Sequence, residues 1–160
     1  MSTTNVRGSI EYLVGDATAP EGEGPFVVAH VVNDLGGWGR GFVLAVSRRW
    51  KEPERAYRDL ARRGLVLGTT QLVAVTPQVT VANMVAQHGY ASASNPTALD
   101  YEALAACLAS LDSLATASAG IVMPRIGTKL AGGKWEDVEP LVVRELVARG
   151  RHVRVYDLPR

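Results

Sequence analysis

Residues 120–135 read Gly-Ile-Val-Met-Pro-Arg-Ile-Gly-Thr-Lys-Leu-Ala-Gly-Gly-Lys-Trp. A short apolar run gives way here to a glycine-bearing loop, and the loop leads into a helical pattern. Glycines let backbone N–H groups approach an anion closely, and the first turn of a helix presents unpaired donors to the same point. The stretch therefore predicts a strand, a phosphate-binding loop and a helix, although an ordinary strand-to-helix connection has the same layout. Its glycine spacing fits neither the P-loop nor the dinucleotide fingerprint.

A second glycine-rich loop lies about ninety residues earlier. Residues 33–42 read Asn-Asp-Leu-Gly-Gly-Trp-Gly-Arg-Gly-Phe, and they follow another apolar run. Ligands of open α/β sheets bind at the carboxyl ends of the strands, so we expect the two loops to grip one diphosphate. Asp16, at the end of the first apolar run, is placed to accept a hydrogen bond from the amino group of adenine.

The pattern along the rest of the chain predicts an α/β fold. Apolar, β-branched runs predict strands covered on both faces at 9–14, 26–32, 71–75, 79–85, 121–123 and 153–158. Helical periodicity predicts helices at 41–50, 53–63, 101–116 and 135–149. The break at Thr76-Pro77-Gln78 between two strand-like runs predicts a hairpin, so the sheet should be mixed.

Length and charge narrow the class of protein. The 160 residues, 47% of them hydrophobic, fit one domain spanning 1–160. Seventeen Lys and Arg stand against sixteen Asp and Glu, which leaves a net charge of +1. Proteins that hold nucleic acid through its phosphates are usually far more basic, so any such contact must be local.

The remaining composition argues against metals and membranes. One cysteine, Cys107, allows neither a disulfide framework nor a cysteine metal site, and three scattered histidines suggest no ligand spacing. We therefore expect no metal and no cofactor. The polar first residues and the lack of an 18-residue apolar run predict a cytoplasmic protein with no membrane partner, which we expect to be a monomer.

Four segments resemble the macrodomain family. They are Gly15-Asp16, residues 30–42, residues 123–136 beginning Met-Pro-Arg-Ile-Gly, and residues 153–158. They follow the family's order, and the resemblance extends over nearly the whole chain. The sequence looks most like the branch of the hydrolase that removes terminal ADP-ribose from glutamate and of its relatives that remove ADP-ribose from thymidine in DNA. The resemblance implies a three-layer α/β/α domain with a mixed, mostly parallel sheet of about six strands. It also implies that ADP-ribose, or ADP-ribosylated protein or DNA, is the partner.

The resemblance assigns binding roles to the two loops and to both ends of the chain. Asp16 would hold the adenine amine, Tyr156 would stack near the base, and the loops would surround the diphosphate and the distal ribose. The ligand-binding residues predicted in this way are Asp16, Ala17, His30, Gly37, Trp38, Gly39, Arg40, Gly41, Arg125, Gly127, Thr128, Lys129, Leu130, Ala131, Gly132 and Tyr156.

Four of these residues have a structural alternative. Trp38 is either a lid on the ligand or a plug in the domain surface, because a bare indole between glycines is costly. His30 fits a core histidine as well as a ligand contact, and Tyr156 fits edge-strand packing as well as base stacking. Arg125 either neutralises phosphate or forms a structural ion pair.

The catalytic residues depart from the family's pattern. The ester-cleaving branch uses a lysine near the end of the hairpin's second strand and an acid in the later glycine loop, where this chain has Gln87 and Ala131. Glutamine forms no lysyl adduct and alanine transfers no proton, so that mechanism is excluded. We expect a hydrolase in which Asn33 or Gln87 orients the ribose or a water, and Asp34 or His88 handles protons. The alternatives are a non-catalytic ADP-ribose reader and a phosphatase acting on phosphorylated ADP-ribose.

Overall fold

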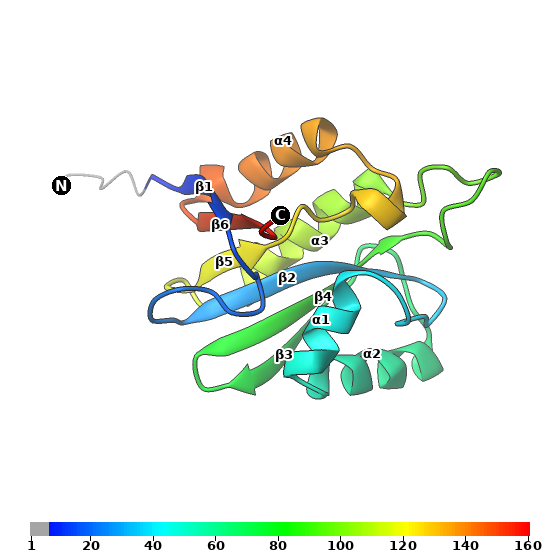
Figure 1. The fold of residues 1–160 in the computed structure, drawn as a ribbon, viewed down its shortest axis with the longest axis horizontal. Coiled ribbons are helices and arrows are strands. Elements are labelled where there is room, and N and C mark those ends of the chain that lie inside the picture. The colour runs from blue at the N-terminus through cyan, green and yellow to red at the C-terminus, as the bar shows by residue number, and fades with distance from the viewer. Residues whose placement is uncertain (1–6) are drawn as a thin grey trace.

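A six-stranded sheet forms the middle layer of the computed structural model, which describes residues 7–160 (Figure 1). The strand order is β1-β6-β5-β2-β4-β3, and only the β3–β4 pair is antiparallel. The predicted mixed, mostly parallel sheet is thus confirmed. The strands are β1 (Ser9–Val14), β2 (Phe26–Asn33), β3 (Thr70–Thr76), β4 (Val79–Gln87), β5 (Gly120–Met123) and β6 (His152–Asp157).

Two helices cover each face of the sheet, which gives the predicted three-layer α/β/α arrangement (Figure 1). One face carries α1 (Phe42–Arg49) and α2 (Glu52–Arg63), and the other carries α3 (Tyr101–Leu114) and α4 (Trp135–Glu145). Two short 3-10 turns, η1 (Lys129–Ala131) and η2 (Val147–Arg149), complete the elements. Among residues 7–160, no helix combines the length and the apolar character needed to cross a bilayer.

The alternation of side chains along β2 shows why the strands read as continuous apolar runs. Val27 and Ala29 are buried in the cluster under α3 and α4, whereas Val28 and Val32 are buried in the cluster under α1 and α2. Successive strand residues point to opposite faces, so a strand covered on both sides must be apolar at nearly every position.

The helix predicted at 135–149 is shorter than expected. It ends at Glu145, and the chain continues through η2 to Gly150, whose φ of 98° suits glycine. The Leu146 carbonyl accepts hydrogen bonds from both Arg149 and Arg151 N–H groups, which tightens the last turn.

Arg151 also closes the end of α3. Its guanidinium donates to the carbonyls of Asp112 and Ala115 at 2.8 and 3.0 Å, and to the Asp112 carboxylate at 2.8 Å. The last carbonyls of a helix otherwise lack partners, so this buried side chain ends α3 at Leu114 rather than at the predicted residue 116.

Candidate ligand-binding cleft

A cleft of about 310 Å³ opens at the carboxyl ends of β2 and β4. Its wall combines the end of β2, the loop after it (residues 34–41, the first glycine loop), the start of α1, the segment after β4, and one residue of the loop after β5 (residues 124–134, the second glycine loop). The lining residues are Val31, Val32, Asn33, Gly37, Gly39, Arg40, Val43, Gln87, Tyr90, Ala91 and Leu130.

The two glycine loops meet at this cleft. A Cβ atom built on Gly41 would lie 3.2 Å from Cδ1 of Leu130, so the backbone of the first loop packs against the second loop's side chain. The parallel pairing of β2 with β5 brings their carboxyl ends to the same edge. The predicted meeting of the loops is confirmed, whereas the binding of a diphosphate between them stays a prediction.

The second glycine loop contributes less to the wall than we predicted. Gly127 and Gly132 have φ values of 74° and 78°, and a Cβ on Gly132 would overlap the Pro96 carbonyl. A Cβ on Gly127 would lie 2.6 Å from the Leu99 side chain. These glycines therefore serve a tight turn packed against the segment before α3. Thr128, Lys129 and Ala131, like both glycines, do not line the cleft; of the six residues predicted here, only Leu130 does.

The helix that begins at the cleft is α1, not α4 as the sequence suggested. Val43, in the first turn of α1, lines the cleft. In the second glycine loop, η1 and the three residues after it lie between Thr128 and the start of α4. No side chain caps the N-terminus of α1, and its first turn contains no acid. Its unpaired N–H groups and partial positive charge therefore remain for an anion, beside the exposed Arg40.

Trp38 is a core residue, and the prediction of a lid is wrong. Its side chain is only 3% exposed, its ring lies 5.4 Å from that of Tyr57, and its Nε1 donates to Ser47 Oγ at 2.7 Å. The flanking glycines turn the indole inward, under α1 and α2, where it fills the space between these helices and the sheet. The structure therefore favours the other interpretation, in which Trp38 packs into the domain instead of covering a ligand.

His30 is also a core residue, so the prediction that it contacts a ligand is wrong. It is 1% exposed, and its Nε2 lies 2.6 Å from Asn83 Oδ1. Burial lowers the pKa of His30 from 6.5 to about 4, and the hydrogen bond to Asn83 opposes this only in part, so the ring is neutral. No hydrogen-bond partner of its Nδ1 is found among residues 7–160.

Asn33 organises the first glycine loop from within the cleft wall. Its Oδ1 accepts hydrogen bonds from the N–H groups of Leu35 and Gly37 at 2.9 and 3.1 Å. The Tyr57 hydroxyl donates to the Asn33 carbonyl at 2.7 Å and also lies 2.9 Å from Oδ1. Asn33 Nδ2 donates to the Gly37 carbonyl at 2.8 Å. The oxygen is thus saturated, and one N–H of the amide is left for a ligand.

Gln87 and Tyr90 form the opposite wall. Gln87 lines the cleft, and its Nε2 donates to the Gly89 carbonyl at 2.9 Å. Its Oε1 makes no hydrogen bond to any residue in 7–160. Tyr90, which we did not predict, reaches across to the first glycine loop, because a Cβ on Gly37 would overlap its hydroxyl. The feature of the sequence that could have indicated Tyr90 is that it is a single aromatic residue in a polar loop just after Gln87.

Asp34 and His88 pair with each other just outside the cleft wall. His88 Nδ1 lies 2.7 Å from Asp34 Oδ2, and the Gly89 N–H donates to Asp34 Oδ1 at 2.9 Å. The hydrogen bond and the charge of Asp34 raise the pKa of His88. Burial works to raise the pKa of Asp34, but the Gly89 N–H and His88 together hold it below its ordinary value. The pair ties the end of β2 to the end of β4 beside Asn33 and Gln87.

The predicted adenine-binding residues lie together, away from the cleft lining. Asp16 Oδ1 accepts hydrogen bonds from the N–H and the hydroxyl of Thr18, at 2.8 and 2.7 Å. Tyr156 is 4% exposed and packs with Ala17 and against Gly15, which favours its packing alternative over base stacking. Asp16 Oδ2 has no hydrogen-bond partner among residues 7–160, so the predicted contact with an adenine amine stays a prediction.

Arg125 forms a structural ion pair. Its guanidinium binds both carboxylate oxygens of Asp157, at 2.8 and 3.0 Å, and lies over the rings of Tyr12 and Trp135 at 5.1 and 5.5 Å. These contacts hold the second glycine loop to β1, β6 and α4, so the predicted phosphate contact gives way to the ion-pair alternative.

Comparisons with known proteins decide the family. No family model matches the chain. The structure of a macrodomain protein from Streptomyces coelicolor is 47% identical, covers 93% of this chain and 99% of its own, and superposes with a TM-score of 0.82. The chain belongs to the macrodomain family. A Bacteroides thetaiotaomicron protein of unknown function is 45% identical over 94% of this macrodomain and 99% of its own chain, with a TM-score of 0.90.

More distant relatives place the macrodomain in larger proteins. The mouse chromodomain-helicase-DNA-binding protein 1-like is 33% identical over 95% of this chain, which spans only 18% of that relative's length. The Thermosipho africanus DarTG structure, in complex with ADP-ribose, shares the fold at 18% identity and a TM-score of 0.67, over 83% of this chain and 38% of its own.

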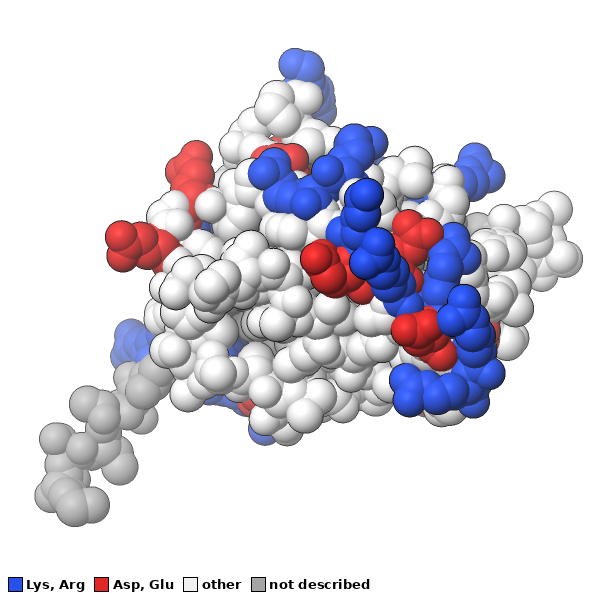
Figure 2. Space-filling model, turned by 90° about the horizontal axis from the view of Figure 1, so that it is seen from below, with Lys and Arg blue, Asp and Glu red and all other residues white. Residues whose placement is uncertain are grey.

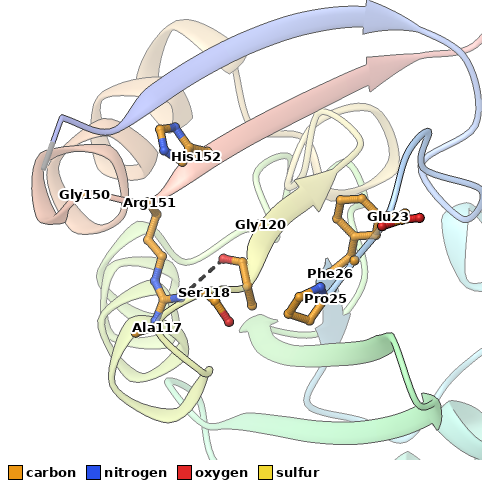
Figure 3. A pocket seen from close by; sticks show the side chains of 11 residues that line it. Glu23, Pro25, Phe26, Ala117, Ser118, Gly120, Gly150, Arg151 and His152 are labelled. Carbon is orange, nitrogen blue, oxygen red and sulfur yellow. Dashed lines mark hydrogen bonds between the residues drawn. The ribbon is translucent and has the colours of Figure 1, made fainter.

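A second cleft of about 310 Å³ lies at the opposite edge of the macrodomain's sheet, at the amino ends of β2, β5 and β6 (Figure 3). Arg151 points from one wall toward the turn after α3, and Pro25 and Phe26 lie on the other. The guanidinium is already bound to the end of α3, as described above, so it has no free group for a ligand. No predicted site residue lines this cleft.

The structure brings together no metal site among the residues it describes. Within 7–160, no three His, Cys, Asp or Glu side chains gather as ligands of an ion would. The cleft at the carboxyl edge, with its cation, its helix N-terminus and its amides, is therefore the candidate site.

Proposed function

We propose that the cleft binds ADP-ribose. The observation that carries this proposal is the meeting of the two glycine loops over the carboxyl ends of parallel strands, at the uncapped N-terminus of α1. A diphosphate there meets unpaired backbone N–H groups, the partial positive charge of the helix and the guanidinium of Arg40. A protein with the same fold, DarTG, is known in complex with ADP-ribose, which supports the proposal.

The second part of the proposal is hydrolysis of the bond between the distal ribose and a modified group. Its substrates would be ADP-ribose on acidic side chains of proteins or on thymidine in DNA. Water adds its oxygen to the ribose carbon, the bond to the modified group breaks, and that group takes up a proton. The free Oε1 of Gln87 accepts a hydrogen bond from the attacking water, and the remaining N–H of Asn33 holds a ribose hydroxyl.

Two features replace the absent lysine and acid. The bond breaks with developing positive charge on the ribose, which the nearby anionic diphosphate stabilises without a protein nucleophile. Proton transfer falls to the Asp34–His88 pair, one residue beyond Asn33 and Gln87, through a water at the rim. Because the raised pKa of His88 favours its protonated form, turnover that uses it as an acid should fall as the pH rises through that value.

Binding and turnover are tested separately. Calorimetry with ADP-ribose should show saturable uptake, and incubation with an ADP-ribosylated glutamate peptide or thymidine oligonucleotide should release ADP-ribose. No uptake refutes the whole proposal. Uptake without turnover identifies a reader. Release of inorganic phosphate from a phosphorylated ADP-ribose, with no release of ADP-ribose from the peptide or the oligonucleotide, identifies a phosphatase. Either result refutes the proposed hydrolysis.

A matched pair of variants isolates Gln87. Gln87→Met keeps the side-chain length but removes the acceptor from the cleft, whereas Gln78→Met makes the same change in the exposed turn between β3 and β4. We expect Gln87→Met to lower kcat by roughly tenfold to a hundredfold with little change in the Kd of ADP-ribose. Gln78→Met should change neither quantity, and equal rates for the two variants would remove Gln87 from the mechanism.

A further inference from the structure

The outer surface of α1 and α2 concentrates positive charge that the cleft does not use (Figure 2). Residues 48–63 contain seven Lys and Arg and three Asp and Glu, a net charge of +4 in a chain whose total is +1. All seven cations are exposed. We call this surface the basic face; its members are Arg48, Arg49, Lys51, Arg55, Arg58, Arg62 and Arg63.

The cations of α2 form a straight row. Lys51, Arg55, Arg58 and Arg62 follow one another at intervals of four, three and four residues, which places them on one side of the helix. At 1.5 Å per residue the row is about 16 Å long. Such a row matches the spacing of charges along one strand of a phosphate backbone better than a point-like anion.

Most of this charge is uncompensated. Among residues 7–160, only two of the seven cations form ion pairs, Arg58 with Glu54 and Arg62 with Asp59. Both pairs are exposed and contribute at most about 1 kcal/mol each, so a phosphate can replace the carboxylate at little cost. Six of the seven cations are arginines, whose planar forks bind phosphate oxygens two at a time.

The surroundings of the row distinguish among polyanions. Leu44 is the only exposed large hydrophobic side chain between residues 42 and 63, so the surface lacks the apolar centre typical of a protein interface. It also lacks an exposed aromatic side chain on which the bases of a single strand would stack. A duplex, whose bases are stacked inside and whose phosphates face outward, fits a surface whose exposed cations outnumber its acids and which offers no aromatic ring for stacking.

We propose that the basic face binds the phosphate backbone of double-stranded nucleic acid. The surface lies close to the cleft, because Tyr57 of α2 bonds to Asn33 and to Gly36 of the first glycine loop. A duplex on α1 and α2 therefore runs beside the rim of the cleft. The proposal stands independently of what the cleft binds.

The test uses fluorescence anisotropy with a mixed-sequence DNA duplex of about 20 base pairs and salt from about 50 to about 200 mM. We expect binding whose logarithm falls with the logarithm of salt with a slope of about −4, as for about four phosphate contacts. Arg48→Gln/Arg55→Gln removes one cation of the row and one from the neighbouring α1, so it should reduce this slope by about 1 to 2 and weaken binding at low salt by tenfold or more. Arg144→Gln/Arg149→Gln, which removes two exposed charges from the opposite layer, should bind as the wild type does.

Four results would overturn the proposal: no duplex binding at low salt, an equal loss in both double variants, tighter binding of a single strand, or equal competition by poly-glutamate. Circular dichroism of both variants checks that they fold. Calorimetry with ADP-ribose on Arg48→Gln/Arg55→Gln separates the two sites, because a variant that loses the duplex and keeps ADP-ribose affinity shows a surface distinct from the cleft.

Discussion

His30 couples the stability of the protein to pH. Its folded pKa of about 4 lies below its ordinary 6.5, so as the pH falls below 6.5 the unfolded chain takes up a proton that the folded chain refuses. Stability should therefore fall by about 2 kcal/mol between about pH 7 and about pH 5. Urea unfolding at each pH measures this. His30→Gln, which keeps an amide donor near Asn83, should flatten the dependence, and an unchanged slope in this variant would assign it to other groups.

Trp38 should affect folding rather than binding. Trp38→Ala removes a buried indole and should cost about 3 to 5 kcal/mol of unfolding free energy. Trp38→Phe keeps much of the packing but loses the hydrogen bond to Ser47, and should cost about 1 to 2 kcal/mol. Denaturant unfolding gives these values, and calorimetry should show a Kd for ADP-ribose in Trp38→Phe within about twofold of the wild type. If Trp38→Phe bound ADP-ribose tenfold more weakly at unchanged stability, Trp38 would contact the ligand after all.

Side-chain directions were the hardest feature to predict from the sequence. Trp38 and His30 both belong to segments that also contribute residues to the cleft. Neither segment has a hydrophobic period that shows which of its side chains point to the core and which point to the cleft. Trp38 lies in a glycine-rich turn without regular dihedrals, and His30 lies in a strand buried on both faces. For such residues, only the tertiary structure decides whether a polar or aromatic side chain meets the core or a ligand.

At the scale of elements, local patterns were sufficient. Strand β1 matches the prediction, and the other strands extend or shift by one or two residues. The bounds were predictable because each apolar run is followed directly by the turn residues that end it. Local patterns did not show which helix begins at the cleft. The stretch after β5 resembles an anion-binding loop, yet its glycines pack against Pro96 and Leu99. The helix that begins at the cleft is α1, whose first turn contains no acid, whereas the first turn of α4 contains two.

The first glycine loop offers a matched test of cleft shape. A Cβ on Gly37 overlaps the hydroxyl of Tyr90, which lines the opposite side of the cleft. Because the hydroxyl is the far end of a flexible side chain, Gly37→Ala should fold normally and displace Tyr90 from the wall. We expect its Kd for ADP-ribose to rise by roughly threefold to tenfold, in line with the loss of one aromatic contact. Tyr90→Ala, which removes the same ring and leaves the loop unchanged, should raise the Kd by a similar factor, and an unchanged Kd in both variants would exclude Tyr90 from the site.

At the scale of the whole molecule, the sheet places two kinds of surface in fixed relation. Its carboxyl edge holds the cleft, and its α1–α2 layer holds the basic face, and Tyr57 connects them through Asn33. This explains how a chain with a net charge of +1 can present a strongly cationic surface. The charge is segregated to one layer, so global composition hides it, and only the helical spacing of residues 51–62 reveals it.

Ligand binding should register as stability of the entire domain, because the cleft is built from both glycine loops and from strands at the centre of the sheet. A ligand that binds only the folded state at about 100 times its Kd adds about 2.7 kcal/mol. For a domain of this size, that shift corresponds to a rise in Tm of about 5 to 10 °C. Scanning calorimetry with ADP-ribose should show this rise, and AMP, which lacks the distal ribose and one phosphate, should give a smaller one. Equal shifts for the two nucleotides would mean that the protein reads the adenosine end and that the glycine loops hold no diphosphate.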